Sequence, residues 1–100
     1  MKFLVIARPR QGQQGMTSAM VQKTREMLKA DIKSGRVDFI YHFAGGNGVA
    51  GIYNVDSGDA LDEALQRYPT TPFVDHETYP LADGDKFFAN LIEGLKRQGL

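Results

Sequence analysis

The stretch that decides the fold runs from Val37 to Leu65 and reads VDFIYHFAGGNGVAGIYNVDSGDALDEAL. Two segments rich in β-branched and aromatic residues, Val37–Ala44 and Val49–Val55, lie on either side of a glycine-rich run. This pattern predicts two antiparallel strands joined by a turn. Ser57 or Asp59 can then cap a short helix. The stretch therefore predicts strand, turn, strand and helix, in that order.

The same stretch contains Gly46, Gly48 and Gly51, which match the G-x-G-x-x-G fingerprint of dinucleotide-binding folds. That fingerprint has its meaning between a strand and a helix, where a pyrophosphate meets the helix N-terminus. Here a second strand follows the glycines, and no helix begins before Ser57. We interpret the glycines as a hairpin turn and not as a nucleotide site.

Upstream, the apolar run Phe3–Arg8 predicts a central strand. A polar loop follows, and Thr17-Ser18 can cap a helix that runs to about Ser34 and stops at Gly35. The apolar residues of this helix fall on one predicted stripe, which comprises Met20, Val21, Met27, Leu28 and Ile32.

Downstream, Pro69 and Pro72 bracket a loop before a fourth predicted strand, Phe73–Tyr79. A last helix is expected over Gly84–Gln98. Its large apolar side chains share one side and are Phe87, Phe88, Leu91, Ile92 and Leu95. The order β-α-β-β-α-β plus a terminal helix predicts an α+β, ferredoxin-like fold in a single domain over residues 1–100.

Helices would cover only one face of this sheet. The first strand is apolar on both faces, with Phe3 and Val5 on one and Leu4 and Ile6 on the other. A chain of 100 residues buries only about two-thirds of its unfolded surface, so a partner subunit would help to complete the core. We therefore expect a homodimer that packs through its open sheet faces.

Composition narrows the function classes. Lys plus Arg and Asp plus Glu each number 12, so the net charge is zero and no basic surplus indicates a nucleic-acid partner. There is no cysteine, and the two histidines are not spaced as a metal-binding pair. The apolar run after Lys2 is too short for a signal peptide or a membrane span. We expect a cytoplasmic protein that has no membrane partner and binds no metal.

Alternation within the hairpin predicts which residues share a face. With an even loop, His42 lies on the face of Gly51 and Tyr53, whereas Tyr41 lies on the opposite face with Asn54. Imidazole titrates near neutrality, so His42 is the first candidate for a general acid/base. The alternative is a half-buried histidine bonded to a backbone carbonyl.

Four further residues are candidates for catalysis or substrate binding. Tyr41 and Tyr53 could each donate a hydrogen bond to a developing oxyanion, although aromatic residues on a sheet more often serve packing. Arg8, at the end of the first strand, could hold a substrate carboxylate, or it could be a solvated cation. Asn54, beside Tyr53 in the sequence, is a candidate for substrate binding.

The fourth strand carries the cluster Asp75-His76-Glu77. Alternation sends His76 to one face and both carboxylates to the other. His76 is a second candidate for substrate binding. The alternative is that charges on an edge strand guard against pairing with another sheet.

The run AGGNGVAGIYNVDSGDALDEALQRYP, followed by PFVDHETYPLAD, resembles the muconolactone isomerase family. The residues that carry the match are mostly structural and are Gly45, Ala50, Val55, Ser57, Ala60, Leu61, Leu65, Pro69, Pro80 and Leu81. The loop in ARPRQGQQG and the helix around Phe87–Leu95 differ from the family pattern. The resemblance implies a dimeric α+β barrel, in some members assembled into rings of dimers.

The family's activity implies a small-molecule substrate and no cofactor. The reaction is a shift of a proton and a double bond in an unsaturated lactone that carries a carboxylate. On this basis His42 would carry the proton, Tyr41 or Tyr53 would donate to the oxyanion, and Arg8 would hold the carboxylate. Related barrels include cyclases that act on polyketide-like aromatics, so we expect an isomerase or cyclase that acts on an unsaturated lactone or a polyketide-like molecule. Two alternatives stay open: a ligand-binding or assembly module without catalysis, and a cofactor-free oxygenase.

Overall fold

The computed structural model describes residues 1–100 and contains one antiparallel sheet with the strand order β2-β3-β1-β4. The strands are β1 (Lys2–Pro9), β2 (Val37–His42), β3 (Val49–Asn54) and β4 (Val74–Leu81). With the helices between them, they give the β-α-β-β-α-β order of the ferredoxin-like fold. The predicted α+β class is confirmed.

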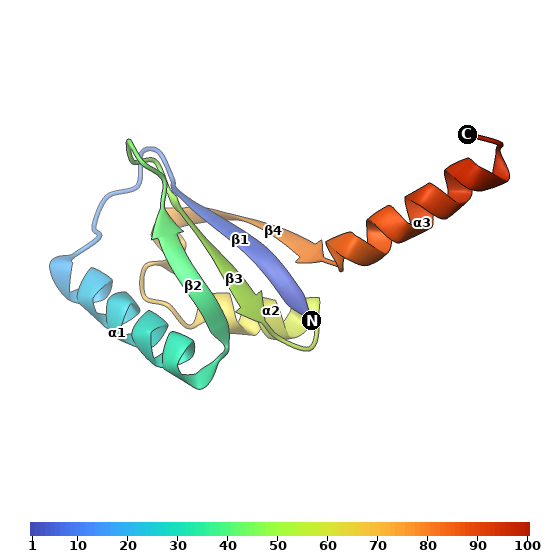
Figure 1. The fold of residues 1–100 in the computed structure, drawn as a ribbon. Helices are drawn as coiled ribbons and strands as arrows, with labels where there is room; N and C mark the ends of the chain where they lie inside the picture. Colours follow the sequence, from blue (N-terminus) through green and yellow to red (C-terminus); the bar gives the residue numbers. More distant parts are fainter.

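Three α-helices accompany the sheet: α1 (Ser18–Ser34), α2 (Gly58–Gln66) and α3 (Gly84–Arg97). A short 3₁₀ helix, η1 (Thr71–Phe73), precedes β4. Figure 1 shows α1 and α2 on one face of the sheet, whereas α3 leads away from the body beyond the end of β4. This projecting helix explains the elongated dimensions of 60 × 30 × 24 Å. None of the helices has both the length and the apolar character that crossing a membrane requires.

The helix boundaries follow from capping residues. Thr17 accepts a hydrogen bond from the Met20 amide at 3.2 Å, and Gly35 ends α1 with a left-handed φ of 84°. The Ser57 hydroxyl accepts from the Ala60 amide at 3.1 Å and so starts α2. Each of these caps satisfies backbone groups that the helix leaves open. The predicted limits of α1 are confirmed, and Ser57 is the cap of α2.

The hairpin turn is longer than predicted, because β2 ends at His42 and not at Ala44. The Phe43 amide donates to the Gly48 carbonyl oxygen at 2.9 Å and closes the turn. Gly48 has a φ of 138°, and a Cβ there would lie 2.7 Å from the Ala7 carbonyl oxygen. The glycines therefore form the hairpin turn, as predicted, and Gly48 allows this turn to pass close to β1. The fourth strand also differs from the predicted Phe73–Tyr79, because Phe73 belongs to η1 and the strand runs from Val74 to Leu81.

The strand register confirms the predicted faces of the hairpin. His42 pairs with Val49 and Ile40 pairs with Gly51, which places them on the face that α1 and α2 cover. Tyr41 pairs with Ala50 on the opposite face. A register shift between Val37 and Phe39 breaks the alternation at the start of β2, so Val37 returns to the covered face.

The core lies between the sheet and the two packed helices. It consists of seven buried residues: Phe3, Val5, Val37, Tyr53, Leu61, Leu65 and Tyr68. The stripe predicted for α1 is wrong in part, because Val21 and Ile32 are 48% and 42% exposed. The buried residue of this helix is Asp31. A stripe predicted by counting apolar residues misses a polar side chain that points inward.

The uncovered face of the sheet, which we call the open face, is largely apolar. Leu4 and Ile6 of β1 point toward it, as their pairing with Ile52 and Ala50 of β3 shows. Tyr41 is 69% exposed there. β1 therefore presents apolar side chains to both faces, as predicted.

Candidate active site between the sheet and the helices

A cavity of about 120 Å³ lies between the covered face of the sheet and the elements packed on it. Its walls are mainly apolar, and three of its lining residues carry a polar ring group: Tyr53 from β3, Tyr68 after α2, and His76 from β4. An apolar pocket with a few polar groups is the usual form of a small-molecule site. The cavity is therefore the candidate active site.

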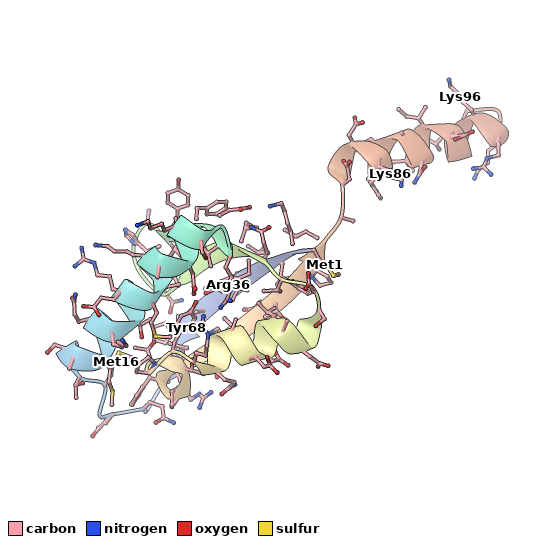
Figure 2. The ribbon with its side chains drawn as sticks, turned by 90° about the horizontal axis from the view of Figure 1, so that it is seen from below. Met1, Met16, Arg36, Tyr68, Lys86 and Lys96 are labelled. Atoms are coloured by element: carbon pink, nitrogen blue, oxygen red, sulfur yellow. The ribbon has the colours of Figure 1, made fainter.

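The two tyrosines belong to a buried chain of hydrogen bonds. Their hydroxyl oxygens lie 2.9 Å apart, and the Tyr68 hydroxyl donates to Asp31 Oδ2 at 2.8 Å. In Figure 2 the labelled Tyr68 lies between α1 and α2. Through this residue the chain of hydrogen bonds reaches from the sheet to α1. All three residues are buried, with exposed fractions of 3%, 6% and 7%.

The order of donors in this chain follows from the carboxylate. Because Asp31 can only accept, the Tyr68 hydrogen is committed to it. The Tyr68 oxygen must then accept from Tyr53. The Tyr53 oxygen keeps its lone pairs for another donor, and its own hydrogen can turn to a ligand only by leaving Tyr68.

Burial raises the pKa of the Tyr53 hydroxyl above its ordinary value of 10. Burial also raises the pKa of Tyr68, and the hydrogen bond that it donates to the Asp31 carboxylate raises it further. Both phenols are therefore neutral at pH 7. They can donate or relay a proton, but neither is a tyrosinate base.

Asp31 receives its charge compensation from two arginines. Arg67 Nη2 lies 3.1 Å from Asp31 Oδ2, and Arg36 Nη1 lies 3.9 Å from Oδ1. The Arg67 guanidinium also stands 5.7 Å from the ring centre of Tyr68. Both arginines line a polar outer cleft of about 450 Å³. The buried chain thus runs from the cavity to a solvent-facing cationic pair.

His76 is the one imidazole that lines the cavity. Alternation along β4 points its side chain to the covered face, opposite Ala7 of β1. Burial lowers the pKa of the imidazole below its ordinary 6.5, although the nearby Asp75 carboxylate raises it. The neutral ring is therefore the main form at pH 7 and can accept a proton.

The structure places His42 outside the cavity. It lies on the same face as Tyr53 but at the exposed end of β2, with Nδ1 3.1 Å from the Phe43 carbonyl oxygen. This contact is the backbone bond that the sequence offered as the alternative to catalysis. The catalytic role of His42 stays a prediction.

Three other predicted site residues lie on the open face, away from the cavity. Tyr41 packs against Phe39 with ring centres 5.1 Å apart. Arg8 forms an ion pair with Glu77 at 3.4 Å. The structure does not bring these residues together with His42 or Tyr53, so the single site expected from the sequence is not formed within one chain.

Asn54, the third of these residues, is held at the other end of the sheet. Its side chain accepts from Lys2 Nζ at 2.7 Å and donates to Asp38 Oδ1 at 2.6 Å. The hydrogen bond from Lys2, with that from Asn54, lowers the pKa of the Asp38 carboxyl. The contacts of Asn54 fasten β3 to β1 and β2.

Sequence reasoning missed Asp31, Arg67 and Tyr68. The available signal was helical spacing, because Asp31 stands four residues after Met27 and so falls on the inward stripe of α1. Tyr68 stands three residues after Leu65, just past the end of α2. A carboxylate on an inward-facing apolar stripe must have a buried hydrogen-bonding or charged partner, so Asp31 could have indicated a buried polar cluster.

A second hollow, which we call the α1 groove, adjoins the cavity. It has a volume of about 420 Å³, and its lining includes Met16, Val21 and Ile32. Six residues line both hollows: Thr24, Leu28, Ile40, Val49, Thr70 and Val74. Together the two reach the range of about 300–1,000 Å³ that small-molecule sites occupy.

Arg25 and Lys29 are the cations that line the α1 groove. The chain contains no group of three or more His, Cys, Asp or Glu side chains that could hold a metal ion. The ionisable groups that line the two hollows are thus two phenols and one imidazole in the cavity and two cations in the α1 groove.

Comparison with known proteins identifies the relatives of this chain. A family model described as muconolactone delta-isomerase matches residues 1–85. No curated protein sequence matches. A crystal structure of muconolactone isomerase is similar with a TM-score of 0.71 and 21% identity, over 83% of this chain and 90% of that chain.

A second similar structure is 5-chloro-2-hydroxyhydroquinone dehydrochlorinase from Burkholderia phenoliruptrix AC1100, in complex with 2,5-dihydroxybenzoquinone. Its TM-score is 0.62 at 14% identity, and the match covers 86% of this chain and 98% of that chain. At these identities the two structures establish a shared fold. Both are named as enzymes that act on small molecules.

Proposed function

The chain belongs to the muconolactone delta-isomerase family, and we propose that it is an enzyme that moves a proton and a double bond within a small unsaturated, oxygenated molecule. A lactone is the first substrate class, and a polyketide-like compound that cyclises by the same proton transfer is the second. The reaction needs no cofactor, because substrate and product are isomers and no electrons are exchanged.

The observation that carries this proposal is the pairing of two proton-bearing groups in one apolar cavity. His76 is neutral at pH 7 because burial lowers its pKa, and Tyr53 presents a hydroxyl that stays protonated. A base near neutrality and a hydrogen-bond donor are what an allylic proton shift requires. A module that only binds ligands has no need for a base and a proton donor in the same cavity.

In the proposed reaction, His76 removes a proton from the saturated carbon at the far end of the conjugated C=C–C=O group of the lactone (the γ carbon). The electrons of the C–H bond spread through the conjugated system to the carbonyl oxygen. The Tyr53 hydroxyl turns from Tyr68 to this oxygen and stabilises its charge. Tyr68 stays bonded to Asp31. His76 then delivers a proton to the carbon next to the carbonyl, so the double bond shifts.

A carboxylate on the substrate would stay at the mouth of the cavity. The α1 groove is lined there by Arg25 and Lys29, whereas no lysine or arginine lines the cavity. A carboxylate buried deeper would lose its hydration without gaining a partner. We propose these two side chains as the anchor, in place of Arg8 on the open face.

The test is proton NMR of the protein with muconolactone in D₂O, without added cofactor or metal. We expect the substrate signals to decay, the double bond to move and deuterium to enter at the new position. The variant His76→Gln keeps a polar side chain of similar reach and removes the base. It should lose the exchange, while His42→Gln serves as the matched control at the exposed histidine.

An unchanged spectrum with muconolactone and with a panel of unsaturated lactones that bind would overturn the isomerase proposal. It would favour a ligand-binding module on the same fold. Oxygen uptake with an electron-rich aromatic, without isomerisation, would instead favour the cofactor-free oxygenase.

We also propose the setting of this activity. The apolar open face fits packing against a second copy, and so a homodimer or a ring of dimers. The zero net charge fits a small-molecule enzyme without a nucleic-acid partner. Aromatic-compound catabolism or secondary metabolism in the cytoplasm is the proposed context.

A further inference from the structure

The hydrogen bonds between Tyr53, Tyr68 and Asp31 run in one direction only. The Asp31 carboxylate accepts from Arg67 Nη2 at 3.1 Å and, having no hydrogen of its own, can only accept from Tyr68 as well. A phenol carries one hydrogen. Tyr68 gives its hydrogen to Asp31 at 2.8 Å and must accept from Tyr53 at 2.9 Å. Both phenol hydrogens are therefore engaged within the chain of hydrogen bonds.

The carboxylate that sets this direction does not itself meet a ligand. Asp31 is 7% exposed and belongs to α1, and it is not among the residues that line the cavity. Tyr53 and Tyr68 both line it. A ligand in the cavity thus contacts the two phenols, and Asp31 can act on this ligand only through Tyr68.

The other polar side chains that line the cavity are three threonines and His76. The Thr71 hydroxyl donates to the Leu65 carbonyl oxygen, so its hydrogen is also engaged. The hydroxyl oxygens of Thr24 and Thr70 lie 3.0 Å apart and share one hydrogen bond, which leaves one hydrogen free. The neutral His76 ring carries one N–H donor and one acceptor nitrogen. The two phenols differ from these groups, because they offer a ligand only lone pairs.

We propose that Asp31 is a specificity-determining residue, which acts through Tyr68 to make the phenol pair a hydrogen-bond acceptor and so selects substrates that carry a hydroxyl group. This rests on the proposed function in taking the cavity as the substrate site. It narrows the substrate class to unsaturated rings with a hydroxyl donor. A polyketide-like compound carries such hydroxyl groups, whereas a lactone ring by itself offers only acceptors.

A ligand hydroxyl fits the phenols because it adds one hydrogen bond and breaks none. A neutral carbonyl fits them less well. To bond it, Tyr53 would have to withdraw its hydrogen from Tyr68 and leave that buried oxygen with one bond fewer. Without this rearrangement, two acceptor oxygens would face each other. Either outcome leaves a buried polar group unmatched, which costs affinity.

The same direction suits the proposed oxyanion step. A developing oxyanion is a stronger acceptor than the neutral oxygen of Tyr68, since hydrogen bonds to charged groups are about twice as strong. The Tyr53 hydrogen therefore stays with Tyr68 beside a neutral carbonyl and turns only as charge develops. An interaction made only in the transition state raises the rate without tightening substrate binding. Recognition of the substrate is thus left to the lone pairs of the phenols.

Two rings that differ in one functional group test this selection. Cyclohexenol carries a hydroxyl that can donate, whereas the carbonyl of cyclohexenone can only accept. Their dissociation constants are measured on the full-length chain by proton–nitrogen NMR titration, which detects weak binding without turnover. The chain has no cysteine that could add to the enone. We expect the natural chain to bind the alcohol on the order of tenfold more tightly, the effect of one unmatched buried polar group.

Asp31→Leu tests the positioning role. Without the carboxylate, Tyr68 can donate to Tyr53, and the Tyr53 hydrogen becomes free to bond the ketone. We expect the preference for the alcohol to fall toward equal affinity. A merely structural role would weaken the binding of both rings alike and would keep their ratio.

Tyr68→Phe should have the same effect on the ratio, because it removes the acceptor that holds the Tyr53 hydrogen. It keeps the test decisive if Asp31→Leu does not fold. Asp38→Asn is the matched control. That carboxylate bonds Lys2 and Asn54 outside the cavity, so its loss should leave the ratio unchanged.

Equal affinity of the natural chain for the two rings would overturn the proposed selection. An unchanged ratio in both Asp31→Leu and Tyr68→Phe would show that Asp31 does not set it. Binding of neither ring would overturn the proposal together with the choice of the cavity as the substrate site. Selective binding without isomerisation in D₂O would support the selection and overturn only the proposed reaction.

Discussion

The hydroxyl oxygens of Tyr53 and Tyr68 lie 2.9 Å apart, although one residue belongs to β3 and the other follows α2. The bond joins the sheet to the helical layer at the wall of the cavity. Through Tyr68 it continues to Asp31 on α1. One buried polar chain therefore ties the central layers of the fold to the candidate active site.

Tyr68→Phe should destabilise the protein. The change removes the hydroxyl that satisfies both Asp31 and Tyr53, and it leaves two buried polar groups with one bond fewer. We expect a loss of about 1–3 kcal/mol in the free energy of unfolding, measured by urea denaturation. Tyr79→Phe is the matched control, because that hydroxyl bonds Glu77 at the exposed edge and should change little. Equal effects would contradict the buried chain.

The loss of activity at low pH, which is the acid limb of the pH–rate profile, should result from protonation of His76. Burial lowers the pKa of this imidazole below 6.5, so the active neutral form persists at pH 7 and is lost as the pH falls through the lowered value. His76→Gln should reduce kcat by on the order of a hundredfold to ten thousandfold. His42→Gln should keep both the rate and the acid limb. The opposite assignment in the pH–rate profiles would move the base to His42.

Folding stability should also fall on the acid side. A histidine whose pKa is lowered by folding takes up a proton more readily in the unfolded chain, so stability is full above about pH 6.5 and declines below it. His76→Gln should flatten this decline in urea midpoints measured across that range. An unchanged slope would show that other groups cause the acid sensitivity.

Alkaline conditions should destabilise the protein through the two buried phenols. Folding raises the pKa of Tyr53 and Tyr68 above 10, so between about pH 10 and the raised values the folded chain binds more protons than the unfolded chain. Stability must then fall as the pH rises. Urea midpoints near pH 9 and pH 11 would measure the loss, which should shrink in Tyr53→Phe. An identical loss in that variant would contradict the assignment.

Gly51→Ala should disrupt the hairpin. A Cβ at this position would lie 2.8 Å from the Phe39 carbonyl oxygen and would press on the Ile40 side chain. We expect a cost of about 1–3 kcal/mol in unfolding free energy, typical of overpacking. Gly58→Ala, where a Cβ meets nothing within 4 Å, is the control. A neutral result at Gly51 would mean that the hairpin shifts to make room.

Much of the fold could be predicted from the chain because its signals are local. Thr17, Gly35 and Ser57 mark helix ends by capping and by a left-handed φ, and each acts within a few residues. Alternation predicted the faces of His42 and Tyr41, and the structure adds a bulge between Val37 and Phe39 across which alternation does not hold. Counting residues cannot detect a bulge, because it adds one residue without changing composition.

The candidate site was harder to predict, since its members come together only in the folded chain. Tyr68 and Asp31 are 37 residues apart and bond at 2.8 Å because α1 and the segment after α2 share one face of the sheet. The sequence suggested His42 as the base from its chemistry alone. The structure leaves His42 exposed and places His76 in the cavity wall.

The sequence by itself determined the order of elements, the turn chemistry and the alternation of faces, since these depend on neighbours within a few residues. It also determined that α3 is amphipathic. Only the tertiary structure decided which polar side chains meet in a cavity, and that α3 lies clear of its own body. Burial, hydrogen-bond partners and pKa shifts depend on contacts between distant segments, and those contacts exist only once the layers have packed.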